Sequence, residues 1–334
     1  SNGEVVSSGN LIGLTGRTLL IAETKTVEKE TTYEYTMEIT FHETNADQNH
    51  NMEKVINGSI EVEFGMVGSE YILASENAPT SHTTDWTGEE SYYYTGNPNN
   101  WVQFAGFYWR IIRINGDGSI RMIYQGVADS DKPDAGNMTG EGTQIGTSGF
   151  NASNNNNMYV GFKYASNQVH GTRTNSTILG ANNSNDTTTL NGWYRTNLLE
   201  YAEYLDGNAG FCGDRTPSTI ESSSNGSGGT GTTQTYYGAY IRLYGKGTSN
   251  SNPSLQCDSQ DVYTTTDSSS GNKSLQYPIG LVTADEVALT GITWNNANTG
   301  SYLYAECPYW TMSPFYFYAS FDMAYIFIVG MMGS

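Results

Sequence analysis

Basic residues are scarce in this chain of 334 residues. Only 15 Lys and Arg stand against 34 Asp and Glu, which gives a formal net charge of −19. Proteins that bind nucleic acid gather basic side chains into a stripe that neutralises phosphates, and so few scattered bases form none. The same charge would be repelled by an anionic membrane surface. We therefore expect no nucleic-acid partner, and we interpret the acidity as a source of solubility.

Long apolar runs are also missing. The run at residues 19–22 is far shorter than the roughly 20 residues that span a bilayer, and no signal peptide is recognisable. The start at Ser1-Asn2-Gly3 is typical of a trimmed chain. We therefore expect any secretion or membrane-anchoring segment to lie outside this sequence.

Cysteine is rare, with only Cys212, Cys257 and Cys307. No two of them form a C-x-x-C pair, so the sequence predicts neither a zinc ribbon nor a redox motif. Cys212 and Cys257 flank a low-complexity insertion. A disulfide that closes this loop would stabilise the fold by about 3–4 kcal/mol in the chain-entropy description. The alternative is three reduced, buried thiols.

Motifs for cofactors and cations are incomplete. The glycines of residues 226–231 match G-x-G-x-x-G, but they lie in a Ser/Thr/Gly tract instead of between a strand and a helix. The acidic residues of 129–134 resemble a calcium loop. That pattern fails at Pro133, and no acid follows at the bidentate position. We expect neither a cofactor nor a bound metal.

The histidines give no sign of catalysis. None lies in an elbow that a Ser-His-Asp triad would need. His42 and His50 with Asp47 could form a surface metal site, although solvated or structural histidine is the simpler interpretation. The other two are His82 and His170, and the sequence as a whole predicts a protein that is not an enzyme.

Strand patterns and turn residues dominate what is present. Alternation in Tyr33–Phe41 predicts a strand with one wet face, and residues 1–78 are expected to form a small β-sandwich. Residues 79–100 are polar, with proline and glycine, and predict a linker and the loop that leads into a second domain. Residues 101–334 are expected to form that domain, so the predicted fold class is α+β.

A hairpin opens the second domain. Residues 107–114 and 119–124 are expected to be paired strands, because Asn115-Gly116 between two such runs is a strong hairpin signal. Polar composition at residues 128–192 predicts long surface loops. A Gly/Ser/Thr tract at residues 218–234 predicts a flexible insertion.

Two short helices are expected. Residues 193–205 carry large side chains at three- and four-residue steps, with Asn191 as a plausible N-cap. Residues 284–289 follow Thr283, and Glu286 completes a capping box with it.

Aromatic residues form two groups. Trp109 and its hairpin are expected in the core, whereas residues 315–318 are four consecutive aromatics near the C-terminus. A strand cannot bury both faces and remain at a surface, so part of this run should be exposed. Exposed Tyr and Phe supply contact area at a small entropic cost, as binding loops do. The alternative is a strand buried on both sides.

Several motifs together resemble the C-type-lectin-fold domains of Firmicute surface proteins. These are akin to the variable proteins of diversity-generating retroelements and, more distantly, to formylglycine-generating enzymes. The resemblance covers about residues 90–334. Its motifs are YWRIIRINGDG at 108–118, WY at 193–194, NAGFCGDR at 208–215, YPIGLVTADEV at 277–287 and YWTMSP at 309–314.

The resemblance implies a C-type-lectin-like domain whose C-terminal segment contacts a ligand. In retroelement-diversified proteins this segment is rewritten at adenines, and most residue types in 315–330 are reachable from an Asn codon; Met323 is not. The expected scaffold residues are Trp109, Trp193, Trp310 and Pro314. The expected ligand-facing residues are Phe315, Tyr316, Phe317, Tyr318, Ser320, Phe321, Asp322, Tyr325 and Phe327.

Three features depart from the family pattern. Relatives continue into a final strand with a Val-Arg-Pro-type motif, whereas this sequence stops at Ser334. The sugar-binding motif of calcium-dependent lectins is absent as a unit. Cys257 and Cys307 do not lie in the context of the catalytic cysteine pair of formylglycine-generating enzymes.

The sequence thus predicts a binding protein displayed outside a bacterial cell or on its surface. Its partner would be a protein or a surface glycan, and any membrane association would need a segment beyond this sequence. Two alternatives remain: a pilin-like or envelope subunit whose aromatic tail packs on a neighbour, and an enzyme of the formylglycine-generating type.

Overall fold

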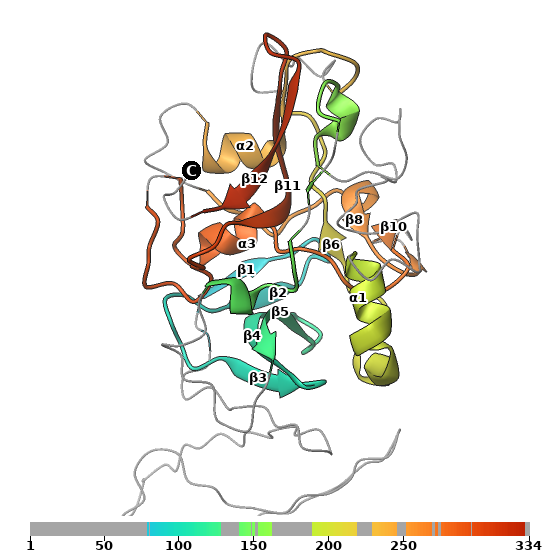
Figure 1. Cartoon of the computed structure of the whole chain (residues 1–334), viewed down its shortest axis with the longest axis vertical. Helices are drawn as coiled ribbons and strands as arrows, with labels where there is room; N and C mark the ends of the chain where they lie inside the picture. Colours follow the sequence, from blue (N-terminus) through green and yellow to red (C-terminus); the bar gives the residue numbers. More distant parts are fainter. Residues whose placement is uncertain are drawn as a thin grey trace, which may run out of the picture. The chain divides into compact units, whose positions relative to one another are not determined.

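The computed structural model describes residues 79, 81–127, 140–147, 149–150, 153–161, 189–218, 229–245, 252–268, 271–272, 275–294 and 296–330. The predicted β-sandwich of residues 1–78 lies outside the described residues, so it stays a prediction. The described part is a mixed α+β structure with mostly strands and a few short helices (Figure 1). None of its helices combines the length and the apolar character needed to cross a membrane.

A five-stranded antiparallel sheet is built around its longest strand pair. β4 pairs with β5 along one edge, and with β2 and β3 along the other. Consecutive side chains of β4 alternate between the two faces of the sheet, and those from Tyr108 to Arg113 are all buried, so β4 is covered on both faces. The strands are β1 (Ser81–Thr84), β2 (Glu90–Tyr93), β3 (Trp101–Phe104), β4 (Phe107–Ile114) and β5 (Ile120–Val127).

The predicted hairpin of β4 and β5 is confirmed. The amide of Asn115 donates to the carbonyl of Ser119 at 2.8 Å, and that of Gly118 donates to the carbonyl of Asn115 at 2.9 Å. Gly118 has φ +85, a conformation that favours glycine.

The prediction of a linker at residues 79–100 was wrong, because β1 and β2 lie within it and extend the sheet. Both strands are only four residues long. The sequence of β1, Ser-His-Thr-Thr, contains no apolar residue, so it lacks the apolar alternation by which a strand is recognised. In the structure its side chains alternate between half-buried and exposed.

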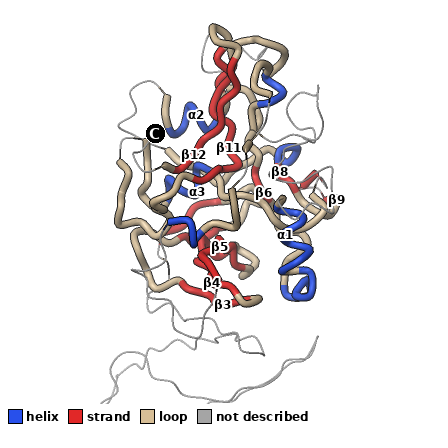
Figure 2. The backbone as a smooth tube through the Cα atoms, viewed as in Figure 1, coloured by secondary structure: helices blue, strands red, loops and turns tan. Residues whose placement is uncertain are grey.

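A second sheet has the order β12-β11-β7, and Figure 2 shows β11 and β12 as a long hairpin. Met312 and Phe317 of β11 are fully buried beneath it. Two small strand pairs complete the sheets. The remaining strands are β6 (Phe211–Cys212), β7 (Thr235–Tyr236), β8 (Val262–Tyr263), β9 (Asp267–Ser268), β10 (Gly271–Asn272), β11 (Tyr309–Tyr318) and β12 (Met323–Val329).

The helices are short. α1 spans Leu190–Asn197 and continues as a 3-10 helix, η4, at Leu199–Tyr204. Its N-cap is Thr189, whose hydroxyl accepts from the amide of Gly192, so the expected cap at Asn191 was wrong by two residues. The described residues also form the 3-10 turns η2 (Gly140–Thr143), η3 (Asn157–Tyr159) and η5 (Ser259–Asp261).

The predicted helix at residues 284–289 is confirmed as α3 (Ala284–Leu289). Its capping box is complete, because Thr283 accepts from the amide of Glu286 at 3.0 Å and the Glu286 carboxylate accepts from the amide of Thr283 at 2.8 Å. A further helix, α2 (Gly238–Leu243), was not predicted. α2 and α3 pack together through Leu243, Ala284 and Ala288.

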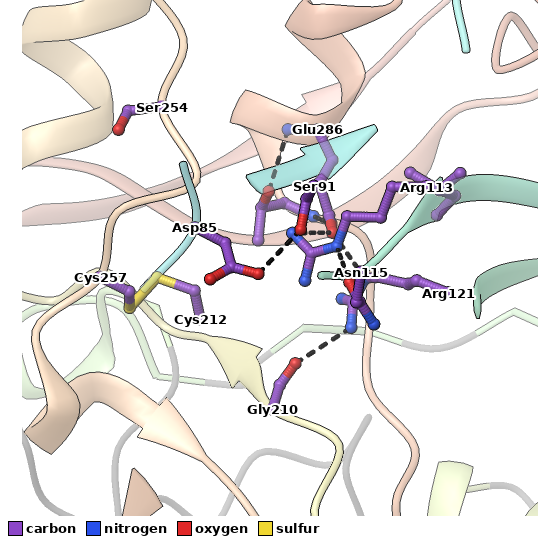
Figure 3. A network of polar contacts seen from close by, with 12 residues as sticks. Asp85, Ser91, Arg113, Asn115, Arg121, Gly210, Cys212, Ser254, Cys257 and Glu286 are labelled. Carbon is purple, nitrogen blue, oxygen red and sulfur yellow. Dashed lines mark hydrogen bonds and ion pairs between the residues drawn. A yellow bond between two sulfur atoms is a disulfide. The ribbon is translucent and has the colours of Figure 1, made fainter. Parts of the chain in front are cut away.

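A buried ionic network joins α3 to the first sheet (Figure 3). The Glu286 carboxylate lies 2.6 Å from Nε of Arg121 on β5 and 3.6 Å from Nη1 of Arg113 on β4. Burial alone would raise the pKa of Glu286, but the two guanidiniums and the capping contacts with Thr283 hold it below its usual value. The carboxylate is therefore ionised and fastens α3 to the sheet.

The structure joins Cys212 and Cys257 by a disulfide, and Cys307 is a half-buried free thiol. The disulfide connects β6 to the chain that follows α2. The two cysteines are 45 residues apart in sequence, so the disulfide restricts the conformations of the unfolded chain.

Candidate functional site

The candidate site begins with an irregularity in β11. Trp310 pairs with Ile328 and Phe317 with Ala324, so seven steps along β11 match four along β12 and three residues of β11 are extra (7 − 4). The shifts lie on both sides of Pro314. Bulges of this kind place more residues of one strand opposite fewer of the other and redirect side chains.

The bulge after Pro314 brings two consecutive rings to one side of the hairpin. In a regular strand, Phe315 and Tyr316 would point to opposite faces. Here their ring centroids lie 4.6 Å apart, and both rings contact Tyr240 of α2, at 5.0 Å and 5.6 Å. Phe317 points to the opposite side, where it packs with Val160 and Tyr237.

The rings on this side form one connected network, which we call the aromatic face. Tyr325 stacks on Tyr316 at 4.8 Å, and Phe327 meets Phe315 edge-on at 4.7 Å. The ends of the network are Trp294, which contacts Tyr244 and Phe315, and Phe321 at the hairpin turn. The aromatic face comprises Tyr236, Tyr240, Tyr244, Trp294, Phe315, Tyr316, Tyr318, Phe321, Tyr325 and Phe327.

The aromatic face is partly open to solvent. Phe321 is 66% exposed and Trp294 41%, and the other eight side chains are half-buried. Burial, followed by the neighbouring tyrosines, raises the pKa of Tyr316. Its phenol is therefore neutral at physiological pH, so this residue presents a ring and an uncharged hydroxyl.

The structure brings most of the predicted ligand-facing residues together. Ser320, Phe321 and Asp322 lie exposed at the turn between β11 and β12, and Asp322 has φ +49. The prediction was wrong for Phe317, which is 0% exposed in the core beneath the hairpin. The remaining five are half-buried members of the aromatic face: Phe315, Tyr316, Tyr318, Tyr325 and Phe327.

None of the four predicted scaffold residues is a member of the aromatic face. Trp109 donates its indole N–H to the carbonyl of Phe104 at 2.9 Å, and Trp193 of α1 contacts its ring at 6.2 Å. Trp310 is half-buried against Phe150 at 5.6 Å. Pro314 is buried at the bulge.

A segment before α1 supports the hairpin from below. The amide of Ala324 donates to the carbonyl of Asn154 at 2.7 Å. Gly161 has φ +63, and a Cβ there would lie 3.0 Å from the Cβ of Pro314. A larger residue at Gly161 would be strained and would push against the bulge, so glycine is required for this close approach.

Four members of the aromatic face were not predicted from the sequence: Tyr236, Tyr240, Tyr244 and Trp294. Tyr236 lies on β7, Tyr240 on α2 and Tyr244 at the C-terminal cap of α2, so the even spacing of the three in sequence does not correspond to a single helix. Trp294 has no local signal either, because it reaches the face through tertiary structure.

Helix α2 is fixed by a charged cluster. Arg242 donates to Asp285 at 2.9 Å and 2.7 Å, and to Asp214 at 2.6 Å. One guanidinium cannot fully compensate two buried carboxylates. Burial, with Asp285 as a nearby like charge, raises the pKa of Asp214 to about 7 despite the presence of Arg242. The cluster connects α2, and so Tyr240, to α3.

The histidines and candidate metal ligands of the sequence lie mostly outside the described residues. His82 lies on β1 at a surface, where its Nδ1 is 3.3 Å from the carboxylate of Glu90. The predicted alternatives at His42, His50, His170 and residues 129–134 lie outside the described residues. Across the part of the chain that the structure describes, no group of three His, Cys, Asp or Glu side chains is arranged to hold a metal ion.

Comparisons of the chain with protein-family models, with curated proteins and with solved structures found no match.

Proposed function

We propose that this protein is a binding module displayed outside a bacterial cell, and that the aromatic face is its recognition surface. The partner is a protein or a surface glycan. The observation that carries the proposal is the continuous network of ten rings that ends at the exposed side chains of Phe321 and Trp294. Binding surfaces favour such residues, since large rigid rings bury much area for little lost rotamer entropy.

The support beneath the rings favours recognition by a preformed surface. α2 is tied to α3 by Arg242, and α3 is tied to the first sheet by Glu286. A surface held in this way loses little conformational entropy when a ligand binds, so more of the contact energy appears as affinity.

We also propose that the described part belongs to the C-type-lectin-like folds. The argument rests on the sequence motifs, together with a disulfide-bridged α+β arrangement of short helices and antiparallel sheets. In such a domain the β11–β12 hairpin carries the changeable segment. A near-identical genomic repeat of the codons for residues 309–334, beside a reverse-transcriptase gene and differing only at adenines, would establish diversification; its absence would remove that element.

A binding screen tests the proposal. The full chain is applied to arrays of surface glycans and of extracellular proteins, and each hit is remeasured with Phe321→Ala and Trp294→Ala. We expect each variant to weaken binding at least tenfold, which corresponds to about 1.4 kcal/mol. Tyr204→Ala is the matched control, because Tyr204 is an aromatic residue that is 56% exposed on η4, outside the aromatic face.

Two outcomes would overturn the proposal. If every ligand bound both variants and the wild type equally well, the aromatic face would not be the recognition surface. If the only partner were another copy of the chain, and Phe321→Ala abolished self-association, the protein would be a packing subunit instead.

A further inference from the structure

A large cavity lies apart from the aromatic face. It has a volume of about 820 Å³, and none of the ten rings of the aromatic face lines it. Its walls come from β5, from α1, and from the chain on either side of α3. Sites for small molecules have volumes of roughly 300–1,000 Å³ and are lined mainly by apolar and aromatic groups. The size of this cavity therefore suits a small molecule.

One wall of the cavity is an aromatic cluster. Trp109, Tyr124 and Trp193 all line it and contact one another edge-on, with ring centroids 5.6–6.2 Å apart. Phe107 supports all three rings from behind, at 5.2–6.4 Å. Tyr124 and Trp193 are only half-buried in spite of these contacts.

A second part of the cavity wall is made of apolar side chains that are not fully covered. Phe211, Ile279, Leu281 and Trp310 line the cavity; they are partly buried and pack against the core around Met312. Covering such surface stabilises a complex by roughly 25 cal/mol for each Å² removed from water. An apolar molecule in the cavity would gain from both walls.

The charges at the cavity are already compensated. Nε of Arg121 pairs with Glu286, and its Nη1 and Nη2 donate to the carbonyls of Gly210 and Leu281 at 3.1 Å and 3.2 Å. The side chain of Arg113 is 2% exposed and shares the same carboxylate. Neither guanidinium is available for the carboxylate or phosphate of a ligand, so an anion would lose its hydration without gaining a partner.

The aromatic wall also carries two hydrogen-bond donors. They are the hydroxyl of Tyr124 and the indole N–H of Trp193, whose side chains line the cavity and are half-buried. Tyrosine and tryptophan in an apolar setting usually find an acceptor. A carbonyl or ether oxygen on the ligand would accept from either donor.

We propose that this cavity is a second binding site, which takes a small, uncharged, largely apolar molecule and binds it more tightly when the molecule carries a hydrogen-bond acceptor. This site is independent of the proposed function of the aromatic face, because the two share no side chain.

Two fluorescent probes with the same ring system test the proposal on the full chain. N-phenyl-1-naphthylamine is neutral, and 1-anilinonaphthalene-8-sulfonate adds one negative charge. We expect saturable binding of the neutral probe with a stoichiometry of one, and at least tenfold weaker binding of the sulfonate. Equal or tighter binding of the sulfonate, or no saturable binding of the neutral probe, would overturn the proposal.

Variants then locate the probe. Leu281→Trp, which fills the cavity, should weaken binding of the neutral probe at least tenfold, whereas Phe321→Ala on the aromatic face should leave it unchanged. The reverse pattern would place the probe on the aromatic face and refute the second site. If Leu281→Trp fails to fold, Ile279→Trp fills the same wall and gives the same readout.

A ketone-bearing neutral probe, 6-propionyl-2-dimethylaminonaphthalene, tests the acceptor requirement. Tyr124→Phe keeps the ring and removes the hydroxyl, and Trp193→Phe keeps an apolar ring and removes the indole N–H. We expect at least one of these variants to lose about fivefold in affinity, the effect of one net hydrogen bond. Neither should affect N-phenyl-1-naphthylamine, which lacks the ketone. Unchanged affinity for the ketone in both variants would exclude these donors.

Discussion

The rings of Phe315 and Tyr316 lie on the same side of the β11–β12 hairpin, with centroids 4.6 Å apart, although the two residues are consecutive in a strand. The register shift between Pro314 and Phe317 makes this possible. Without it, one of the two rings would turn toward the core. The continuity of the aromatic face therefore depends on a backbone feature as well as on residue type.

Two phenylalanines of the hairpin should contribute very differently to stability. Phe317→Ala should lower the free energy of unfolding by about 3–5 kcal/mol, because it leaves a cavity beside Val160 and Tyr237. Phe321→Ala should change it by less than about 0.5 kcal/mol, because the ring is 66% exposed. Urea denaturation measures both values. A large loss in Phe321→Ala would show that this ring is part of the core.

A substitution at Glu286 tests the ionic network that joins α3 to the first sheet. Glu286→Gln removes the charge that compensates Arg113 and Arg121, and a buried ion pair broken on one side costs about 3–5 kcal/mol. Thr283→Ala, which removes the cap of the same helix and leaves the ion pairs, should cost only about 1 kcal/mol. Chemical denaturation compares the two. Similar small losses in both variants would mean that the ionic network does not hold α3 in place.

Stability should depend on pH through Asp214. The pKa of this carboxyl is raised from 3.8 to about 7 in the folded protein, so between these values the folded state keeps a proton that the unfolded state has released. This group therefore makes the free energy of unfolding fall as pH rises from about 4 to 7, by at most about 1.4 kcal/mol per pH unit, and its effect levels off above 7.

Asp214→Asn should remove that slope in denaturation curves measured between pH 5 and 8. Asp117→Asn is the control. Hydrogen bonds from Ser119 lower the pKa of Asp117, so its titration lies below this window. An Asp214→Asn variant that keeps the wild-type slope would assign the pH dependence to another group.

The disulfide should contribute to stability, whereas the free cysteine should not. Replacing both Cys212 and Cys257 by serine frees a loop of 45 residues in sequence separation, and the chain-entropy relation gives a loss of about 4 kcal/mol. Cys307→Ser changes a half-buried thiol outside any disulfide and should cost less than about 1 kcal/mol. Thermal and urea denaturation under oxidising conditions check both. Equal stability of the double variant and the wild type would contradict the prediction.

Local signals predicted the local parts of the fold. The turn at Asn115-Gly116 and the capping box of Thr283 and Glu286 each involve residues at most four apart, so the sequence contains the whole interaction. β1 and β2 were missed because short strands with polar residues show no apolar alternation. α2 was missed because a six-residue helix carries little periodicity, and its tyrosines resemble those of strands.

The candidate site was predicted only in part, because the sequence shows local clusters of residues and not their tertiary contacts. A cluster of aromatic residues at 315–327 is visible in the sequence, but the side to which each ring turns is not. Alternation would group Phe315 with Phe317, whereas the bulge separates them. Tyr240 and Trp294 join the face through contacts that span long stretches of sequence. The partners of Glu286 in β4 and β5 are equally distant in sequence.

Hydroxyl-radical footprinting of the full chain, read out residue by residue with mass spectrometry, tests the central claim most directly. Phe321 and Phe317 have the same intrinsic reactivity and lie four residues apart, so their oxidation rates compare exposure alone. An open aromatic face predicts that Phe321 is oxidised at least tenfold faster than Phe317, with Trp294 also rapidly modified. Comparable protection of Phe321 and Phe317 would show that the rings fill the interior, and would contradict the account.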